Sequence, residues 1–317
     1  MRTIILVVGV LLLAVGQASA APFSALIDFG DSLSDVGNDY ATTLGTLPGG
    51  PGYYNGRFSN GPIWVEKLGQ SLGLGAPTPS TSGGNDYAYG GVTSGTGYTS
   101  VVLPNVETQV NGWTGSHAAT PTELFTVLGG ANDLLNYLGG TTTPTPAQAA
   151  DNIAASIHAL YTDGARNILV SDLPDLGSTP RFHGTAAQST ATAVSVQFNT
   201  ELALDLSSLS STSSGLKIYN LDLFTLIDQA VSNPGKYGLT DVTDQAYTGD
   251  TSFAGNGTAV SNPSGYLFWD SIHPTTTGQS LIANAAVAAI PEPCGLGIVI
   301  VASASLLRRR HRHISKY

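Results

Sequence analysis

Ala25-Leu-Ile-Asp-Phe-Gly-Asp-Ser-Leu-Ser-Asp35 combines a short apolar run with a glycine and a serine. The apolar run stops at Gly30, which predicts a buried strand that leads into a tight turn. Ser32 lies on that turn, at the carboxyl end of the predicted strand. Ligands bind at this edge in open parallel α/β sheets. We therefore interpret Ser32 as a candidate nucleophile.

Further short apolar segments predict more buried strands, and segments with helical spacing separate most of them. The predicted strands cover 85–91, 124–128, 167–171 and 216–220, and the predicted helices cover 63–72, 106–113, 146–161, 185–209, 223–230 and 277–290. Alternating strands and helices indicate right-handed βαβ units and a parallel sheet of about five strands. We expect Ser59 or Asn60 to cap the helix that follows, with Pro62 in its first turn. The polar segment 239–265 reads as a long loop over the site.

The body of the chain is acidic and has little cysteine. The 317 residues include 12 lysines and arginines, half of which lie before residue 21 or after residue 290, against 22 aspartates and glutamates. This charge argues against nucleic acid or an anionic membrane surface as the main partner. The single cysteine is Cys294, near the C-terminus, so the main domain has no disulfide. Residues 21–290 fit one large α/β domain.

Both ends of the chain are typical of processing signals. Residues 1–20 have an apolar core from Ile4 to Val15 and small residues at their end, the pattern of a secretory signal peptide. An uncleaved membrane anchor is the alternative. Residues 291–317 begin with Pro-Glu-Pro, continue through an apolar run and reach an arginine cluster from Arg308 to Arg310. The apolar run, 294–307, is short for a full membrane span, and the basic cluster fits a cytoplasmic stop.

A serine hydroxyl needs a base within hydrogen-bond reach, and His273 is the best candidate. Asp270 lies three residues before it, where a carboxylate can hold the tautomer of the imidazole ring and stabilise its protonated form. The pattern Asp-x-x-His alone is a weak signal. The other histidines of the body are expected to be surface or structural residues; they are His117, His158 and His183.

Ester cleavage places negative charge on the carbonyl oxygen, and preorganised donors must meet that charge. The candidate donors are the N–H groups of Ser32 and Gly91 and the side-chain amide of Asn132. A glycine N–H can approach closely because glycine has no side chain. Gly90 competes with Gly91, which also suits an ordinary turn. Asn132, with its neighbour Asp133, suits a helix cap equally well.

These segments resemble the four blocks of the SGNH (GDSL) hydrolase family, occur in the family's order and cover nearly all of residues 25 to 290. They are Gly30-Asp31-Ser32, the Gly91 block, Gly130-x-Asn132-Asp133 and Asp270-x-x-His273. Two longer stretches resemble the lipase, phospholipase and thermolabile-hemolysin-like branch: Gly56-Arg-Phe-Ser-Asn-Gly-Pro-Ile-Trp-Val65 and Tyr266-Leu-Phe-Trp-Asp-Ser-Ile-His-Pro-Thr275.

The resemblance implies a flavodoxin-like three-layer α/β/α sandwich with a central parallel sheet. It implies Ser32 as nucleophile and His273 as base, with Asp270 orienting the histidine. Ser32, Gly91 and Asn132 would form the oxyanion hole, and no metal or organic cofactor is expected. Relatives often have cysteines in the loop before the Asp-x-x-His block, whereas residues 239–265 have none.

The C-terminal segment, 291–317, resembles the PEP-CTERM sorting signal of Gram-negative bacteria. This resemblance implies transient membrane association through the tail and cleavage by an exosortase-type enzyme. A permanent weak C-terminal anchor is the alternative. The mature protein would then be periplasmic, at the cell surface or extracellular.

Together these features predict an exported serine ester hydrolase that favours short to medium acyl chains. Its substrate would be a small ester, a lipid or an acylated glycan. One alternative is an O-acetyl esterase that acts on extracellular polysaccharide, and another is a non-catalytic glycan-binding envelope or matrix protein. Calcium binding by Asp241, Asp244 and Asp250 is disfavoured, because their spacing lacks the EF-hand pattern.

Overall fold

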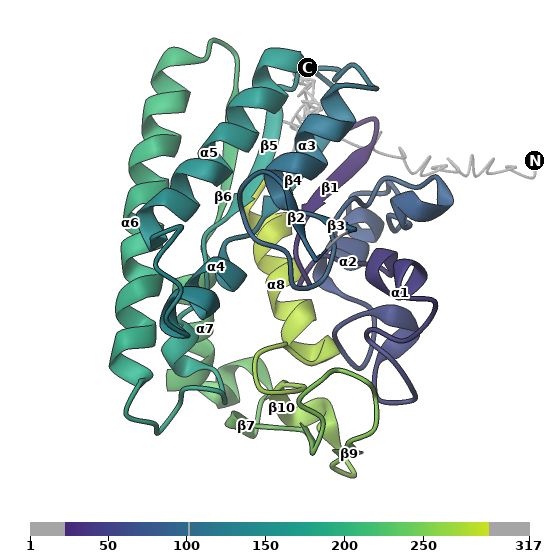
Figure 1. Cartoon of the computed structure of the whole chain (residues 1–317), viewed down its shortest axis with the longest axis vertical. Helices are drawn as coiled ribbons and strands as arrows, with labels where there is room; N and C mark the ends of the chain where they lie inside the picture. Colours follow the sequence, from purple (N-terminus) through teal and green to yellow (C-terminus); the bar gives the residue numbers. More distant parts are fainter. Residues whose placement is uncertain (1–22, 101, 292–317) are drawn as a thin grey trace, which may run out of the picture.

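A four-stranded parallel sheet lies at the centre of the computed structural model, which describes residues 23–100 and 102–291 (Figure 1). The strands are β1 (Leu26–Gly30), β4 (Leu124–Leu128), β5 (Asn167–Ser171) and β6 (Lys217–Leu221), and this is also their spatial order. Leu26 pairs with Leu124, and Asn167 pairs with both Leu124 and Lys217, so the strands end level with one another. Their carboxyl ends therefore meet along one edge.

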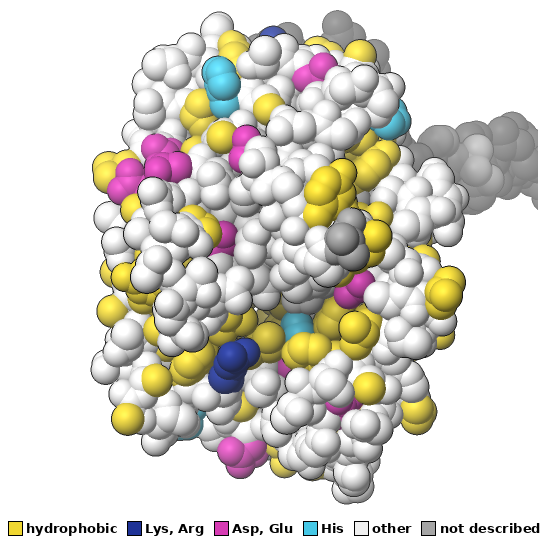
Figure 2. Space-filling model, in the orientation of Figure 1, with side chains coloured by type: hydrophobic (Ala, Val, Ile, Leu, Met, Phe, Trp, Pro, Cys, Tyr) yellow, Lys and Arg dark blue, Asp and Glu magenta, His cyan; other side chains and the backbone are white. Residues whose placement is uncertain are grey.

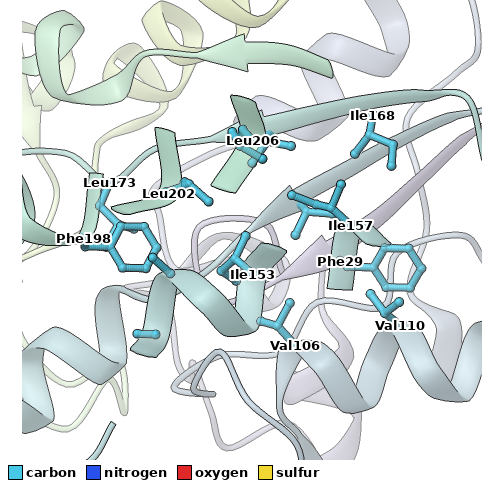
Figure 3. Close-up of a cluster of buried hydrophobic side chains, with 14 of the residues drawn as sticks. Phe29, Val106, Val110, Ile153, Ile157, Ile168, Leu173, Phe198, Leu202 and Leu206 are labelled. Carbon is cyan, nitrogen blue, oxygen red and sulfur yellow. The ribbon is translucent and has the colours of Figure 1, made fainter. Parts of the chain in front are cut away.

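Alternate residues of the strands face two separate helical layers. Ile27, Phe29 and Phe125 pack against one layer, part of which is shown in Figure 3, whereas Leu26 and Leu124 pack against the other. The first layer contains α3 (Val106–Thr114), α4 (Ala131–Leu138), α5 (Pro146–Asp163) and α6 (Gln188–Thr212). The second contains α2 (Trp64–Ser71) and α8 (Thr276–Ala289), with the start of α7 (Leu223–Ser232) beside them. The predicted three-layer sandwich is confirmed.

The predicted strand over residues 85–91 is irregular, so the sheet has four strands and not five. The segment still runs beside β1: the Asp28 N–H donates to Asn85 O at 2.9 Å, and the Tyr87 N–H donates to Asp28 O at 2.8 Å. The Asp86 carboxylate accepts the N–H of Ala88 at 2.9 Å. This side-chain contact with the backbone competes with a regular ladder.

The predicted cap of α2 is wrong. The helix begins at Trp64, after Pro62, and Glu66 Oε2 accepts the N–H of the N-cap residue Ile63 at 2.9 Å. Asn60 instead contacts the start of α8: its Oδ1 accepts the Thr276 N–H at 2.7 Å, next to the N-cap residue Thr275, whose side chain accepts the Gly278 N–H. The other predicted helices are confirmed, with ends that differ by a few residues. A short helix, α1 (Asn38–Thr42), precedes α2.

Residues 239–265 contain more regular structure than predicted. β7 (Asp241–Gln245) pairs in parallel with β10 (Tyr266–Phe268), and β8 (Tyr247–Thr248) pairs with β9 (Thr258–Ala259). A further small pair joins β2 (Tyr98–Thr99) to β3 (Leu103–Pro104). Through β7, the segment 239–265 is therefore fixed to β10, the strand that leads into Asp270.

The predicted signal peptide, residues 1–20, and almost all of the predicted sorting tail, 291–317, lie outside the described residues. Within residues 23–100 and 102–291, no helix is both long and apolar enough to cross a membrane.

Candidate active site

The turn after β1 holds Ser32 at the carboxyl edge of the sheet. Gly30 is required at the start of this turn, because a Cβ there would lie 2.6 Å from the carbonyl oxygen of Leu128 on β4. Asp31 then closes the turn: its Oδ1 accepts the Leu33 N–H at 3.0 Å, and its carbonyl accepts the Ser34 N–H at 3.0 Å. The turn therefore projects the Ser32 side chain away from the end of the strand.

Ser32, His273 and Asp270 form one hydrogen-bonded chain. The distance from Ser32 Oγ to His273 Nε2 is 2.9 Å, and His273 Nδ1 lies 2.8 Å from Asp270 Oδ2. A carboxylate only accepts hydrogen bonds, so Nδ1 carries a proton and Nε2 presents its lone pair to the serine hydroxyl. All three side chains are buried. The structure thus brings together the three residues that the sequence singles out for catalysis.

Asp270 is held as a carboxylate by its own turn and by the imidazole. Burial raises its pKa, but His273 and the N–H groups of Ile272 and His273 outweigh burial and leave the pKa below its usual value. These N–H groups donate to Oδ1 at 3.0 and 2.8 Å. The carboxylate therefore stays charged wherever the imidazole needs a partner.

The remaining predicted donors lie on segments next to the Ser32 turn. Among the described residues, the N–H groups of Ser32 and Gly91 donate to no protein acceptor, whereas the Gly90 N–H donates to Asp35 Oδ2 at 3.1 Å. This contact leaves Gly91, whose φ is 73°, as the free donor of the glycine pair. Asn132 uses one amide hydrogen to hold Val92 O at 2.8 Å and keeps a second hydrogen free.

Asn132 does not cap a helix. It lies in the first turn of α4, whose N-cap is Gly130, and it lines the same pocket as Ser32 and His273. The neighbouring Asp133 accepts two hydrogen bonds from Ser94, through N–H at 2.8 Å and through Oγ at 3.0 Å. These contacts tie α4 to the segment that carries Gly91.

The histidine is supported by residues whose role the sequence did not reveal. Phe58 and Phe253 flank the imidazole with ring centroids at 5.1 and 5.3 Å, and Ser59 Oγ donates to Pro274 O at 2.9 Å. Tyr53 donates from its hydroxyl to Asp270 at 2.9 Å. The resemblance pointed to the 56–65 block, but its contacts with the histidine turn become visible only in three dimensions.

The other histidines are exposed, as predicted. His117 stacks on Trp113 with ring centroids 5.0 Å apart. Asp241 and Asp250 accept N–H groups from nearby residues of the chain, at 2.9 Å from Asp244 within β7 and at 2.6 Å from Gly255.

An apolar pocket opens beside Ser32, with a volume of about 580 Å³ that includes space open to solvent. Figure 2 shows hydrophobic side chains gathered around a histidine in a hollow of this face. The apolar lining includes Leu135, Leu176, Leu223, Ile227, Phe268 and Ile282. The pocket has an apolar lining and ends at the candidate nucleophile.

Comparison with known families places these features in context. A family model described as GDSL-like Lipase/Acylhydrolase matches residues 26–286. The chain belongs to this family. It is therefore a hydrolase of the esterase and lipase type. The match runs from the start of β1 to α8 and so includes every residue of the site described above.

Several curated proteins are similar over most of the chain. A phosphatidylcholine-sterol acyltransferase of Aeromonas hydrophila is 29% identical and aligns with 88% of this chain and 93% of its own length. Esterase EstA of Pseudomonas aeruginosa is 33% identical over 89% of this chain, which spans only 49% of that esterase. Among solved structures, a lipolytic G-D-S-L protein of Veillonella parvula is 15% identical, with a TM-score of 0.48 and coverage of 83% of this chain and 96% of that one.

Proposed function

We propose that this chain cleaves carboxylic esters through an acyl-enzyme on Ser32. The hydrogen bond between Ser32 Oγ and His273 Nε2 carries this proposal. As Oγ attacks the ester carbonyl, Nε2 takes the serine proton, and the Asp270 carboxylate stabilises the imidazolium that forms. The imidazolium then protonates the leaving alcohol. Water, deprotonated by the same nitrogen, releases the acid and restores the serine.

The free donors beside Ser32 support the same reaction. In the proposal, the N–H groups of Ser32 and Gly91 and the amide of Asn132 receive the oxyanion. Each preorganised donor contributes about 2.7–4 kcal/mol to such a transition state. Because the donors are already fixed by neighbouring contacts, little reorganisation is needed when the charge develops.

The pocket supports an acyl group longer than acetyl. Its lining is dominated by Leu, Ile and Phe side chains, so an alkyl chain gains free energy there at roughly 25 cal/mol per Å² of buried apolar surface. We therefore propose short to medium acyl chains. An O-acetyl esterase acting on extracellular polysaccharide is the second candidate; it would show its highest activity on acetyl esters.

The proposed location follows from the ends of the chain. We propose that residues 1–20 direct export and that residues 291–317 hold the protein at the membrane until an exosortase-type enzyme cleaves the tail. Fractionation of cells that produce the full chain, compared with a chain ending at residue 290, tests this. Retention of both chains in the cytoplasm would contradict the proposal.

The function is tested by assaying the wild type, Ser32→Ala and the exposed control Ser71→Ala on p-nitrophenyl esters from acetate to palmitate. We expect Ser32→Ala to lose hydrolysis and Ser71→Ala to keep it. The highest kcat/KM should fall between butyrate and decanoate. Equal activity of the wild type and Ser32→Ala would refute the acyl-enzyme, and a maximum at acetate with acetate release from an acetylated glycan would favour the second candidate.

A further inference from the structure

Tyr53 connects a segment far away in the sequence to the Asp270 carboxylate. It lies between α1 and α2 in a stretch rich in glycine and tyrosine, yet its side chain is only 4% exposed. Its hydroxyl donates to Asp270 Oδ2 at 2.9 Å, and the same oxygen lies 2.8 Å from His273 Nδ1. Tyr53 is therefore bound to the atom that holds the imidazole.

The two oxygens of Asp270 both lie near His273 Nδ1, at 3.0 Å from Oδ1 and 2.8 Å from Oδ2, but their other partners differ. Oδ1 accepts the N–H groups of Ile272 and His273, which belong to the turn of Asp270 itself. Among the described residues, Tyr53 supplies the one hydrogen bond to this carboxylate from outside that turn. Without it, rotation of the carboxylate about its Cβ–Cγ bond is resisted only by local contacts.

Tyr53 is itself held in place by aromatic rings. Its ring lies 6.3 Å from that of Phe58, 5.7 Å from that of Tyr247 and 6.2 Å from that of Phe253, all in edge arrangements. Phe58 and Phe253 also contact the His273 ring. Edge-to-face packing of this kind adds to simple area burial, so the hydroxyl is aimed at Asp270 by a rigid cluster that also encloses the imidazole.

The phenol remains a donor at every working pH. Burial, and then the negative charge of Asp270, raise the pKa of Tyr53 above its ordinary value. A protonated phenol beside a permanent carboxylate makes a charge-assisted hydrogen bond, which is stronger than a neutral one. The contact therefore persists through the pH range in which an ester hydrolase with a histidine base operates.

We propose that Tyr53 is a positioning residue of the catalytic machinery. By donating to Oδ2 it fixes the orientation of the Asp270 carboxylate and spreads its charge, and through Asp270 it sets the orientation and basicity of His273. It contacts neither the nucleophile nor the pocket that receives the substrate. The inference rests on the proposed role of Ser32, His273 and Asp270.

The test compares Tyr53→Phe with Tyr247→Phe. Tyr247 belongs to the same aromatic cluster, but its hydroxyl accepts the Gly257 N–H and does not bind Asp270. We expect Tyr53→Phe to lower kcat roughly tenfold with KM nearly unchanged. The acid limb of its kcat/KM profile should move to higher pH by roughly half a unit, because the bare carboxylate holds the imidazolium more strongly. Tyr247→Phe should keep both the rate and the acid limb.

A second substitution guards against a misfolded Tyr53→Phe protein. Site-specific 3-fluorotyrosine at position 53 keeps the packing and makes the hydroxyl a stronger donor, so the acid limb should move to lower pH. In an Asp270→Ala background, Tyr53→Phe should have no further effect on the residual rate. A wild-type profile for both Tyr53 variants, or the same tenfold loss in the Asp270→Ala background, would overturn the inference.

The Ser32→Ala protein separates this inference from the proposed function. Full activity in Ser32→Ala would mean that the acyl-enzyme proposal fails, and the inference with it. An inert Ser32→Ala protein together with a Tyr53→Phe protein of wild-type rate and profile would leave the function standing and remove only the role of Tyr53.

Discussion

The side chain of Gln109 binds both backbone groups of Gly30. Its Oε1 accepts the Gly30 N–H at 3.0 Å, and its Nε2 donates to the Gly30 carbonyl at 2.9 Å. Gln109 comes from α3, so one buried amide ties a helix of the first layer to the residue that begins the Ser32 turn. The turn is therefore held from three directions: by β4, by Asp31 and by α3.

Replacing Gln109 should loosen this turn. Gln109→Ala leaves the buried Gly30 N–H without its side-chain acceptor, whereas the Gly30 carbonyl keeps the Tyr89 N–H at 3.2 Å. A buried polar group without a partner costs about 1–3 kcal/mol. We expect the free energy of unfolding to fall by about 1–3 kcal/mol in urea titrations. The exposed Gln70→Ala on α2 is the control and should change stability by less than about 0.5 kcal/mol. Equal stability of the two variants would contradict the role of Gln109.

A side chain at position 30 should be poorly tolerated. In Gly30→Ala the new methyl group meets the Leu128 carbonyl, and backbone must shift to relieve the contact. We expect a loss of about 1–3 kcal/mol in stability, as for other overpacked sites, together with a fall in kcat. Gly112→Ala, in α3 with open space around its Cβ, should be neutral or slightly stabilising. The prediction fails if both variants melt at the wild-type temperature.

Asn132 should matter for rate more than for binding. Asn132→Ala removes one of the proposed oxyanion donors, so we expect kcat to fall by about 10²–10³ while KM changes little. Asn136→Ala, which alters an exposed amide on the same helix, is the matched control and should keep wild-type kinetics. Steady-state kinetics on one activated ester suffice, and a KM effect without a kcat effect would assign Asn132 to substrate binding instead.

A bulkier side chain at Ile227 should shorten the preferred acyl chain. Ile227 lines the apolar pocket from α7, so Ile227→Phe reduces the space available to an alkyl group. We expect the ratio of kcat/KM on the octanoate ester to kcat/KM on the acetate ester to fall at least roughly fivefold. Each methylene of the acyl chain that no longer fits in the pocket loses about 0.8 kcal/mol of binding free energy, and several methylenes are affected. The exposed Leu204→Phe on α6 should keep the wild-type ratio. An unchanged ratio in Ile227→Phe would mean that the acyl group lies elsewhere.

The buried carboxyl groups behind Ser32 should make stability depend on pH. Burial raises the pKa of Asp28 to about 7, and burial together with Asp28 and Asp35 raises the pKa of Asp86 well above its usual value. The folded state therefore binds protons that the unfolded state releases above about pH 4. The contribution of Asp28 and Asp86 to the free energy of unfolding is therefore fully present below about pH 4, and it is lost as the pH rises towards 7.

Asp28→Asn tests this dependence, since the amide keeps an acceptor for the Thr126 hydroxyl. Urea midpoints between pH 4.5 and 7.5 should fall less steeply in Asp28→Asn than in the wild type, and the variant should be the more stable protein at pH 7.5. The exposed Asp244→Asn should keep the wild-type slope. Identical slopes for the wild type and Asp28→Asn would show that Asp28 does not hold a proton in the folded state.

Local patterns were sufficient to predict the layers and most of the elements. The runs that became β1, β4 and β5 are buried along their whole length because both faces of these strands are covered, which is the usual pattern of a buried parallel sheet. The edge strand β6 is partly exposed. The segment 85–91 carries the same signal but is bent by the Asp86 side chain. A hydrogen bond between a side chain and the nearby backbone does not change the spacing of apolar residues. The sequence pattern therefore predicts a fifth strand that the structure does not contain.

Contacts between distant segments set the limit of prediction at the site. Helix capping is usually local, so the sequence places Asn60 at the nearer helix, yet its side chain binds the first N–H of α8, 216 positions away. Gly90 and Gly91 were indistinguishable until the Asp35 contact showed which N–H is free. Tyr53 lies 217 positions from its partner Asp270 and in a segment without periodicity, so no pattern in the sequence connects the two.

The link between Asn60 and the first turn of α8 has a consequence for how the protein is made. Chains are synthesised from the N-terminus at roughly 5–20 residues per second and can fold as they emerge. All four strands leave the ribosome before the turn that carries His273, which belongs next to residues made near the start. A nascent chain that has completed its sheet therefore holds a serine without a base. Under the proposed mechanism, it becomes able to attack esters only when the His273 turn and α8 have docked, so the growing chain stays inert until then.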